Sequence, residues 1–187
     1  KKNERASFCY YVFMKAPILR SDNSKIVLIE PVIERDAQLG VIWLNGKPGR
    51  NTLELMGVQK KDIQKPSIEV ERERIKKFIE KDNQLNWMIE FDGNVVGAVW
   101  VDLEPTDYLP CPAVHIMIGE PKARGHRVGT ESIKLVVEYL KNHGFEKLYS
   151  RILITNSVAR SLLLDNGFKL YREQYSDYDG VEWQNVV

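Results

Sequence analysis

Cysteine is scarce in this chain, because its 187 residues include only Cys9 and Cys111. Two cysteines cannot build a disulfide framework, and such usage is typical of the reducing cytosol, so we expect a cytoplasmic protein. The three histidines, His115, His126 and His143, share no short ligand spacing with each other or with the cysteines. A zinc site is therefore not expected, and we predict no metal.

Charge of one sign and long apolar runs are lacking too. The 27 basic side chains are balanced by 26 acidic ones, so no overall electrostatic attraction draws the chain to nucleic acid or to an anionic membrane, and we expect neither as a partner. No apolar run approaches the roughly 20 residues that a membrane-spanning helix needs. The opening residues, which start at Lys1, do not have the apolar core of a secretory signal.

Internal repeats, low-complexity tracts and long linkers are also absent from the sequence. A length of 187 residues suits one compact domain with a full core, since domains commonly hold roughly 100 to 200 residues. We therefore expect a single domain that covers residues 1–187.

The first half of the chain is predicted to form short strands and then helices. Apolar, β-rich segments at 9–14 and 26–30 flank a Ser-Asp-Asn-Ser turn cluster and predict two strands. A helix is expected over 34–44, whereas 47–65, with its glycines and prolines, is expected to be irregular apart from a helical turn. The run 67–81 gathers its apolar residues near one face, which predicts an amphipathic helix with a solvated charged face.

The second half alternates strands and helices more regularly. An Asp-Gly turn predicts a hairpin, and apolar residues spaced at i, i+3, i+4 and i+7 after Thr130 predict a helix that Gly144 ends. This order predicts a mixed α/β sheet. In chain order we expect a hairpin, a strand, a helix, a strand, a helix and two strands, at residues 86–102, 113–118, 131–143, 147–154, 157–165, 169–174 and 181–187.

The most informative stretch, 116–130, runs from a strand through a basic, glycine-containing loop into a helix. The first-turn N–H groups of a helix have no internal partner and lie at the positive end of its dipole, so this geometry suits a phosphate or pyrophosphate. Gly125 and Gly129 would allow a tight turn and a close approach of the ligand to the backbone. The alternative is an ordinary strand-to-helix turn whose basic residues are merely solvated.

Two common phosphate motifs are missing from this stretch, the Walker pattern G-x-x-x-x-G-K-[ST] and the dinucleotide pattern G-x-G-x-x-G. The sequence instead resembles the GNAT superfamily of acetyl-coenzyme A-dependent N-acetyltransferases, whose motif [RQ]-x-x-G-x-[GA] lies at such a junction. Arg124 and Gly129 match the two ends of the motif, and Arg127 stands where its first glycine is usual.

A second motif of the family, N-x-x-A-x-x-L-Y-x-K-x-G-F, follows along the chain. Leu163 and Asp165 replace its Tyr and Lys. The resemblance extends over about 26–187 in element order, and it looks closest to the branch of aminoglycoside 6'-N-acetyltransferases and ribosomal-protein N-terminal acetyltransferases. The positions that match the second motif are Asn156, Ala159, Leu162, Gly167 and Phe168.

The resemblance implies an α/β (α+β) fold with a mixed, mostly antiparallel central sheet of about seven strands and about four flanking helices. The sheet would splay between its fourth and fifth strands, so that the pantetheine arm of acetyl-coenzyme A inserts like an extra strand. Backbone groups of Met117, Ile118 and Gly119 would bond this arm. The amide of Asn156 would bond it too, although Asn also favours the N-cap position of the following helix. The pyrophosphate would be held by main-chain N–H groups of Arg124, Gly125, His126, Arg127, Val128, Gly129 and Thr130.

Acetyl transfer to an amine needs a base, because an alkyl ammonium has a pKa of about 10. His115 lies on the strand before the loop, where some family members place a catalytic acidic residue, and its reference pKa of about 6.5 suits a base; the alternative is a structural histidine. Asp102 and Glu104 could attract a cationic amine or relay a proton through water, or could be solvated loop carboxylates. Leu163, at the usual Tyr position, leaves the acid unassigned.

We therefore expect an N-acetyltransferase that uses acetyl-coenzyme A as co-substrate. The predicted acceptor is a small-molecule primary amine, with a cationic molecule such as an aminoglycoside favoured by the acidic loop residues. Three alternatives stay open: a protein N-terminal acetyltransferase, a noncatalytic acyl-coenzyme A-binding or sensor module, which the missing Tyr favours, and an unrelated nucleotide-binding domain.

Overall fold

The computed structural model describes residues 16–187, so the strand predicted at 9–14 lies outside the described residues. Within the described part the chain forms eight strands, five α-helices and two short 3-10 helices. The strands are β1 (Leu19–Arg20), β2 (Ile26–Ile29), β3 (Gln84–Phe91), β4 (Asn94–Asp102), β5 (Ala113–Ile118), β6 (Ser150–Leu153), β7 (Leu170–Ser176) and β8 (Glu182–Val186). The α-helices are α2 (Ile33–Leu44), α3 (Gly46–Leu55), α4 (Ile68–Glu80), α5 (Val128–Asn142) and α6 (Ser157–Asp165), and the 3-10 helices are Lys60–Asp62 and Pro121–Ala123.

The strands form two antiparallel sheets, one ordered β1-β2-β3-β4-β5 and the other β6-β8-β7. A single parallel bridge between Ala113 and Tyr149 joins them, and beyond it β5 and β6 separate. These are the fourth and fifth strands when the two-residue β1 is left out of the count. The predicted mixed, mostly antiparallel sheet with a splay is confirmed, with one strand and one α-helix more than the approximate numbers expected.

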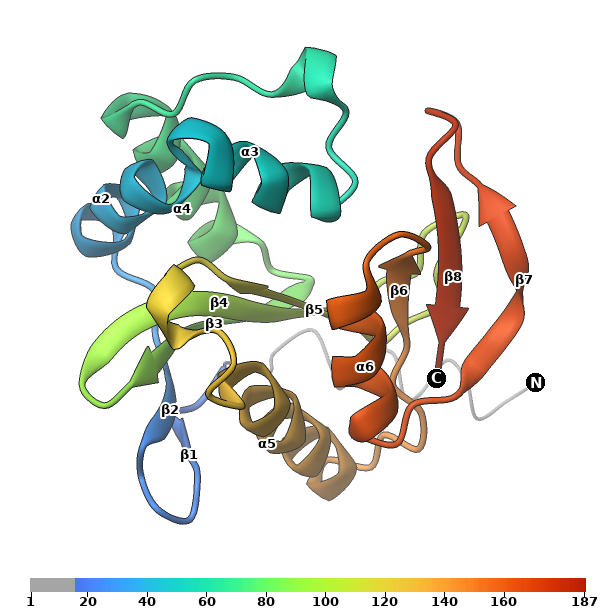
Figure 1. The fold of residues 1–187 in the computed structure, drawn as a ribbon. Coiled ribbons are helices and arrows are strands. Elements are labelled where there is room, and N and C mark those ends of the chain that lie inside the picture. Colours follow the sequence, from blue (N-terminus) through green and yellow to red (C-terminus); the bar gives the residue numbers. More distant parts are fainter. Residues whose placement is uncertain (1–15) are drawn as a thin grey trace.

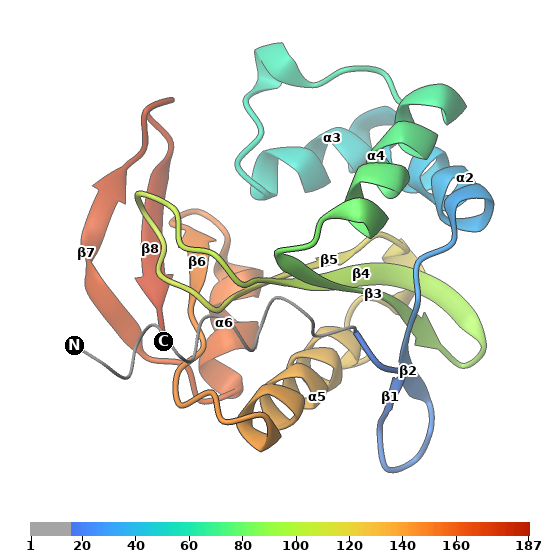
Figure 2. The same cartoon turned by 180° about the vertical axis from the view of Figure 1, so that it is seen from behind.

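Helices cover both faces of the larger sheet. Figures 1 and 2 show α2, α3 and α4 on one face and α5 on the other, with α6 beside the smaller sheet. Alternation along β3 divides the core in the same way, because Trp87 packs with Ile133 of α5 whereas its neighbour Met88 packs with Trp43 of α2. The larger cluster, on the α5 face, also includes residues of β6, β8 and α6, so it binds the two sheets together.

The prediction that 47–65 is irregular was wrong for the first part of this segment, because Gly46–Leu55 forms helix α3, whereas the rest holds only the short 3-10 helix Lys60–Asp62. The Asn45 side chain accepts from the Gly46 N–H at 2.9 Å, and Pro48 lies in the first turn, where its missing N–H breaks no helical bond. Gly49 is required by the sharp corner between α2 and α3, since a Cβ there would overlap the backbone of Leu44. Residues that usually interrupt a helix are placed here at its start.

Other boundaries differ by a few residues. Helix α5 starts at Val128, inside the loop motif, rather than after Thr130, and β6 starts at Ser150 rather than at 147. Helix α4 is amphipathic as predicted, but its one buried residue is Glu71, while Ile79 of the predicted apolar face is 42% exposed. No helix within residues 16–187 combines the length and the apolar character that crossing a membrane requires.

Candidate active site

The gap between β5 and β6 is the main opening in the central sheet. At its closed end, the Val114 N–H donates to the Tyr149 carbonyl and the Tyr149 N–H donates to the Pro112 carbonyl, both at 2.8 Å. The Ser150 hydroxyl donates to the Val114 carbonyl at 2.8 Å. No strand pairing follows beyond these bonds in the described chain. The remaining edge of β5 is therefore open to a ligand.

The antiparallel ladder decides which backbone groups face this gap. Partners in such a ladder alternate between hydrogen-bonded and non-bonded pairs. Val114 directs its N–H to β6, so Val114 and its partner Val101 form a non-bonded pair. The backbone groups of every second residue point the same way, so those of Ile116 and Ile118 also point into the gap. Met117, which the resemblance singled out, forms a hydrogen-bonded pair with Ala98, so its backbone groups point to β4 and not into the gap. Ile116, which was not predicted, thus offers its N–H and carbonyl to the gap, and Ile118 offers its N–H.

The loop after β5 (yellow in Figure 1) leads to an uncapped helix start. Gly125 and Arg127 have positive φ angles of 81° and 60°, and no side chain caps the first turn of α5. The first helical hydrogen bond runs from the Glu131 N–H to the Arg127 carbonyl at 3.0 Å, so the N–H groups of Val128, Gly129 and Thr130 precede the helical ladder. Such N–H groups at the positive end of a helix dipole suit an anion, and pyrophosphate binding here stays a prediction.

Two residues of the first motif have structural roles. The Arg124 guanidinium donates to the Ile118 carbonyl at 2.9 and 3.1 Å and to the Thr52 hydroxyl at 3.1 Å, so it clamps the loop to β5 and α3. A Cβ at Gly129 would overlap Leu162 of α6. Gly129 therefore permits close packing of α5 on α6, and its substitution would disturb this packing as well as any ligand.

Asn156 occupies the N-cap of α6, the structural role that was considered for it. Its Oδ1 accepts from the Ala159 N–H at 3.0 Å, and its Nδ2 donates to the Leu55 carbonyl of α3 at 3.1 Å. The amide thus ties α6 to α3 across the gap, with one N–H left for a ligand. Leu163, in place of the family Tyr, is buried at 4% exposure.

A cavity of about 270 Å³ lies in the gap. Apolar side chains from α3, β5, β6 and α6 supply most of its wall, and His115 and Arg151 are the only members that can carry charge. No carboxylate lines it. The lining residues are Leu55, Met56, Trp100, His115, Ile116, Ser150, Arg151, Ile152, Leu153, Asn156, Ala159, Leu162, Leu163 and Trp183.

His115 and Asp102 are brought together at the cavity. Nε2 of His115 lies 2.9 Å from Oδ2 of Asp102, although the ring N–H is not aligned well enough for a regular hydrogen bond. The His115 ring stacks on Trp100 with the ring centroids 5.3 Å apart. Burial alone would raise the pKa of Asp102, but His115, a hydrogen bond from Gln84 and the charge of Lys81 outweigh it and lower this pKa to about 2. Asp102 is therefore a carboxylate at neutral pH.

Glu104, the third predicted catalytic residue, is not among the residues that line the cavity. Its carboxylate accepts from the Asn83 amide at 2.7 Å. The His126 side chain is not part of the cavity lining either, and its ring centroid lies 6.0 Å from that of Phe91. Of the predicted acid-base residues, the structure thus joins only His115 and Asp102.

Sequence reasoning missed the wall that β6 and β8 contribute. The Trp183 ring is covered on one side by the Arg151 guanidinium, 4.1 Å from the ring centroid, and a Cβ at Gly57 would overlap the ring. The indole N–H donates to Asp177 at 2.8 Å. One signal was available, because Arg151 is the only charged residue of β6, next to the predicted gap.

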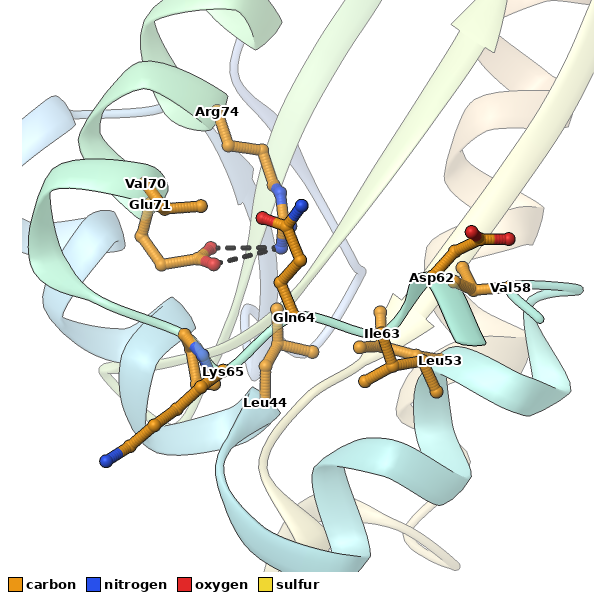
Figure 3. A pocket seen from close by; sticks show the side chains of 11 residues that line it. Leu44, Leu53, Val58, Asp62, Ile63, Gln64, Lys65, Val70, Glu71 and Arg74 are labelled. Carbon is orange, nitrogen blue, oxygen red and sulfur yellow. Dashed lines mark hydrogen bonds and ion pairs between the residues drawn. The ribbon is translucent and has the colours of Figure 1, made fainter. Parts of the chain in front are cut away.

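A second cavity, of about 290 Å³, lies on the far side of α3 (Figure 3). On its wall the carboxylate of Glu71, 2% exposed, pairs with the Arg74 guanidinium at 3.0 Å. Burial raises the pKa of Glu71, and the charge of Arg74 opposes this. A Cβ at Gly40 would come within 2.6 Å of this carboxylate, so the pair packs α4 closely on α2. Glu71 and Arg74 belong to the charged face of α4 that was predicted to be solvated, and here they have a structural role.

Metal binding finds no support in the described residues, where no group of three potential His, Cys, Asp or Glu ligands comes together. The sites relevant to function are thus the gap, its cavity and the helix start beside it.

Known proteins resemble this chain in sequence and in fold. Residues 52–168 match the family described as "Acetyltransferase (GNAT) family". An uncharacterized protein, MJ1062, from Methanocaldococcus jannaschii is 28% identical over 152 residues, which are 79% of this chain and 29% of that protein. The chain thus spans under a third of the length of this relative.

Two solved structures share the fold. The ribosomal L7/L12 α-N-protein acetyltransferase RimL in complex with coenzyme A has a TM-score of 0.70 at 11% identity, covering 91% of this chain and 96% of that one. The aminoglycoside acetyltransferase AAC(6')-Ib in complex with coenzyme A has a TM-score of 0.65 at 17% identity, covering 86% and 93%. At these identities the likeness concerns the fold alone.

Proposed function

We propose, from the premise that this chain belongs to the acetyltransferase (GNAT) family, that it transfers an acetyl group from acetyl-coenzyme A to a primary amine. One observation carries the proposal: the open edge of β5 leads directly to the uncapped start of α5, with the Ile116 side chain reaching towards Gly129. An amide-containing arm that ends in a pyrophosphate fits an exposed strand edge that leads to an anion site.

The reaction needs the amine as a neutral nucleophile. Its nitrogen attacks the thioester carbonyl carbon, a C–N bond forms, and the C–S bond breaks. The amine loses one proton, and coenzyme A leaves as a thiolate that takes up a proton. Because the reference pKa of a thiol is about 8.5, the thiolate can leave with little help from an acid. Leu163 at the Tyr position is compatible with such a reaction.

His115 is the base in this proposal, and Asp102 is its positioning residue. Asp102 lies against Nε2 of His115, which leaves Nδ1 as the ring nitrogen that accepts the amine proton. Stacking on Trp100 holds the ring in place. The Ile118 N–H, directed into the gap, would stabilise the developing oxyanion. Glu104 stays a prediction, as a carboxylate that acts through water.

The acceptor was predicted to be a small cationic molecule such as an aminoglycoside, with a protein N-terminus as the alternative. The acidic residues that favoured a cation are engaged in part, since Asp102 contacts Lys81 at 3.3 Å and Glu104 binds Asn83. Both acceptor classes therefore enter the test as candidates. The cytosolic location also stays a prediction.

Binding and turnover test the proposal separately. Acetyl-coenzyme A at 100 times its dissociation constant should stabilise the fold by about 2.7 kcal/mol, measured by thermal shift. Turnover is followed as coenzyme A release and as product mass, over a panel of aminoglycosides, small amines and N-terminal peptides. Unchanged melting would reject the co-substrate, and binding with no acetylation of any amine would favour the noncatalytic acyl-coenzyme A-binding module. The third alternative, an unrelated nucleotide-binding domain, does not agree with the family to which the chain belongs.

A further inference from the structure

The charge in the gap cavity is of one sign. Its lining contains no Asp or Glu, and His115 and Arg151 are the two lining side chains that can carry a positive charge. Asp102 contacts His115 from outside the lining, and its charge is shared with Lys81. The Arg151 guanidinium is thus the one permanent charge that lines the cavity.

Arg151 lies on the side of the gap away from α5 and α6. Its neighbour Ile152 packs into the cluster formed with α5 and α6, and side chains alternate along a strand, so Arg151 faces the opposite side. There it covers Trp183, whose ring contacts Gly57 after α3. His115 lies on the corresponding side of β5, because it stacks on Trp100, which in turn meets Phe78 of α4. The proposed base and the arginine therefore line the same side of the cavity.

The charge of Arg151 is not balanced by an ion pair. Within residues 16–187, no carboxylate lies within 4.0 Å of its guanidinium. The nearby carboxylate, Asp177, accepts from the Trp183 indole at 2.8 Å and from the N–H groups of Asp179 and Val181 at 3.0 Å. Burial would raise the pKa of Asp177, but these hydrogen bonds and, as the smallest cause, the charge of Arg151 lower it. Burial raises the pKa of the neighbouring Tyr175 hydroxyl, and Arg151 opposes this. The guanidinium carbon lies over the Trp183 ring, 4.1 Å from its centroid, and this cation–π contact holds the charged group at the cavity.

We propose that the acceptor amine carries an anionic group, a carboxylate or a phosphate, and that Arg151 binds this group while the amine faces His115. The inference rests on the proposed function, since it names the substrate class of that reaction. A guanidinium edge matches the two oxygens of either anion. A dicationic acceptor would bring a second positive charge towards Arg151 in a cavity whose lining holds no carboxylate.

A matched series of short amines tests the charge preference. The anionic probes are β-alanine and 2-aminoethylphosphonate, the neutral probe is 3-aminopropanol, and the cationic probe is 1,3-diaminopropane. Since a hydrogen bond to a charged group contributes a factor of roughly 10 to 100, we expect kcat/KM for an anionic probe to exceed that of the neutral probe by this factor. The two anionic probes distinguish a carboxylate-binding site from a phosphate-binding one.

Variants connect the preference to Arg151. Arg151→Glu should reverse the order of the probes, and Arg151→Gln, which keeps the size without the charge, should remove the preference. Both should leave the dissociation constant of acetyl-coenzyme A unchanged. Arg20→Glu is the matched control, because it makes the same charge change at an exposed position of β1. It should keep the wild-type order.

Binding of the same probes to the coenzyme A-loaded protein, measured by calorimetry, separates this inference from the proposed function. Turnover without an anion preference, or with a preference that Arg151→Gln retains, overturns the inference and leaves the function standing. Anion binding that depends on Arg151, without acetylation of any amine, supports the site and rejects the function. Neither binding nor turnover with any probe counts against both.

Discussion

The two walls of the gap are built from different parts of the chain. The β5 wall and the loop to α5 offer main-chain groups, at Ile116, Ile118 and the first turn of α5. The β6–β8 wall offers side chains instead, above all Arg151 stacked on Trp183. Backbone groups suit a ligand that is the same for every member of a family, whereas side chains can be exchanged to suit an acceptor. In the proposed function, the co-substrate would therefore bind along the first wall and the acceptor against the second.

The largest expected effect tests the base. His115→Gln keeps hydrogen-bonding capacity but cannot titrate near neutral pH, so kcat should fall roughly 100- to 10,000-fold. The low-pH limb of the rate profile should change, and acetyl-coenzyme A affinity should not, because the β5 backbone is intact. The control is His143→Gln, at the exposed end of α5. Normal turnover per folded molecule with an unaltered limb would transfer the role to water near Asp102.

The next largest effect is expected from a substitution that disturbs the β6–β8 wall. Gly57→Ala combines a positive φ of 88° with overlap of the Trp183 ring, so urea unfolding should show a loss of about 2 to 3 kcal/mol. Gly144→Ala is the matched control, with φ of 84° and open space at its Cβ, and should cost about 1 kcal/mol. Acceptor KM should rise more than that of acetyl-coenzyme A. Equal losses in the two variants would show that the Trp183 contact contributes nothing.

A smaller effect depends on pH. Asp102 has its pKa lowered from 3.8 to about 2 in the folded protein, so it stabilises the fold above pH 3.8, and this contribution is lost as the pH falls through about 2. Asp102→Asn should therefore be less stable than wild type by about 2 kcal/mol at pH 7. Denaturation curves should show this difference shrinking below pH 4, whereas the exposed Asp22→Asn should show none. A constant difference across pH would contradict the assignment.

The smallest effect concerns the clamp on the backbone wall. Thr52→Val removes the hydroxyl that accepts from Arg124 at 3.1 Å and donates to Pro48 at 3.0 Å. Stability should fall by about 1 kcal/mol, and acetyl-coenzyme A should bind a few-fold more weakly, because Arg124 keeps its bonds to Ile118. Thr155→Val, at an exposed turn, serves as control. An acceptor defect with normal co-substrate binding would place Thr52 with the other wall.

Local signals predicted much of this protein. The Asp-Gly turn predicted the β3–β4 hairpin, the spacing of apolar residues predicted α5 and α6, and the loop motif led to the family to which the chain belongs. Helix α3 was not predicted, because proline and glycine usually interrupt helices. Pro48 and Gly49 are tolerated here only because they lie in the first turn of the helix. Helix propensity is a property of the residue type, whereas the free-energy cost of a proline or glycine depends on its position in the helix.

The sequence by itself determined the order of the elements other than α3, and the helix start that suits an anion, because both depend on neighbours along the chain. Tertiary structure decided which backbone groups of β5 are open, since the choice of Ile116 over Met117 depends on the register with β4. It also decided that Glu71 is buried and that Arg151 meets Trp183 beside His115. These contacts join residues distant in sequence, and pairing across strands, unlike periodicity within one, leaves no local pattern.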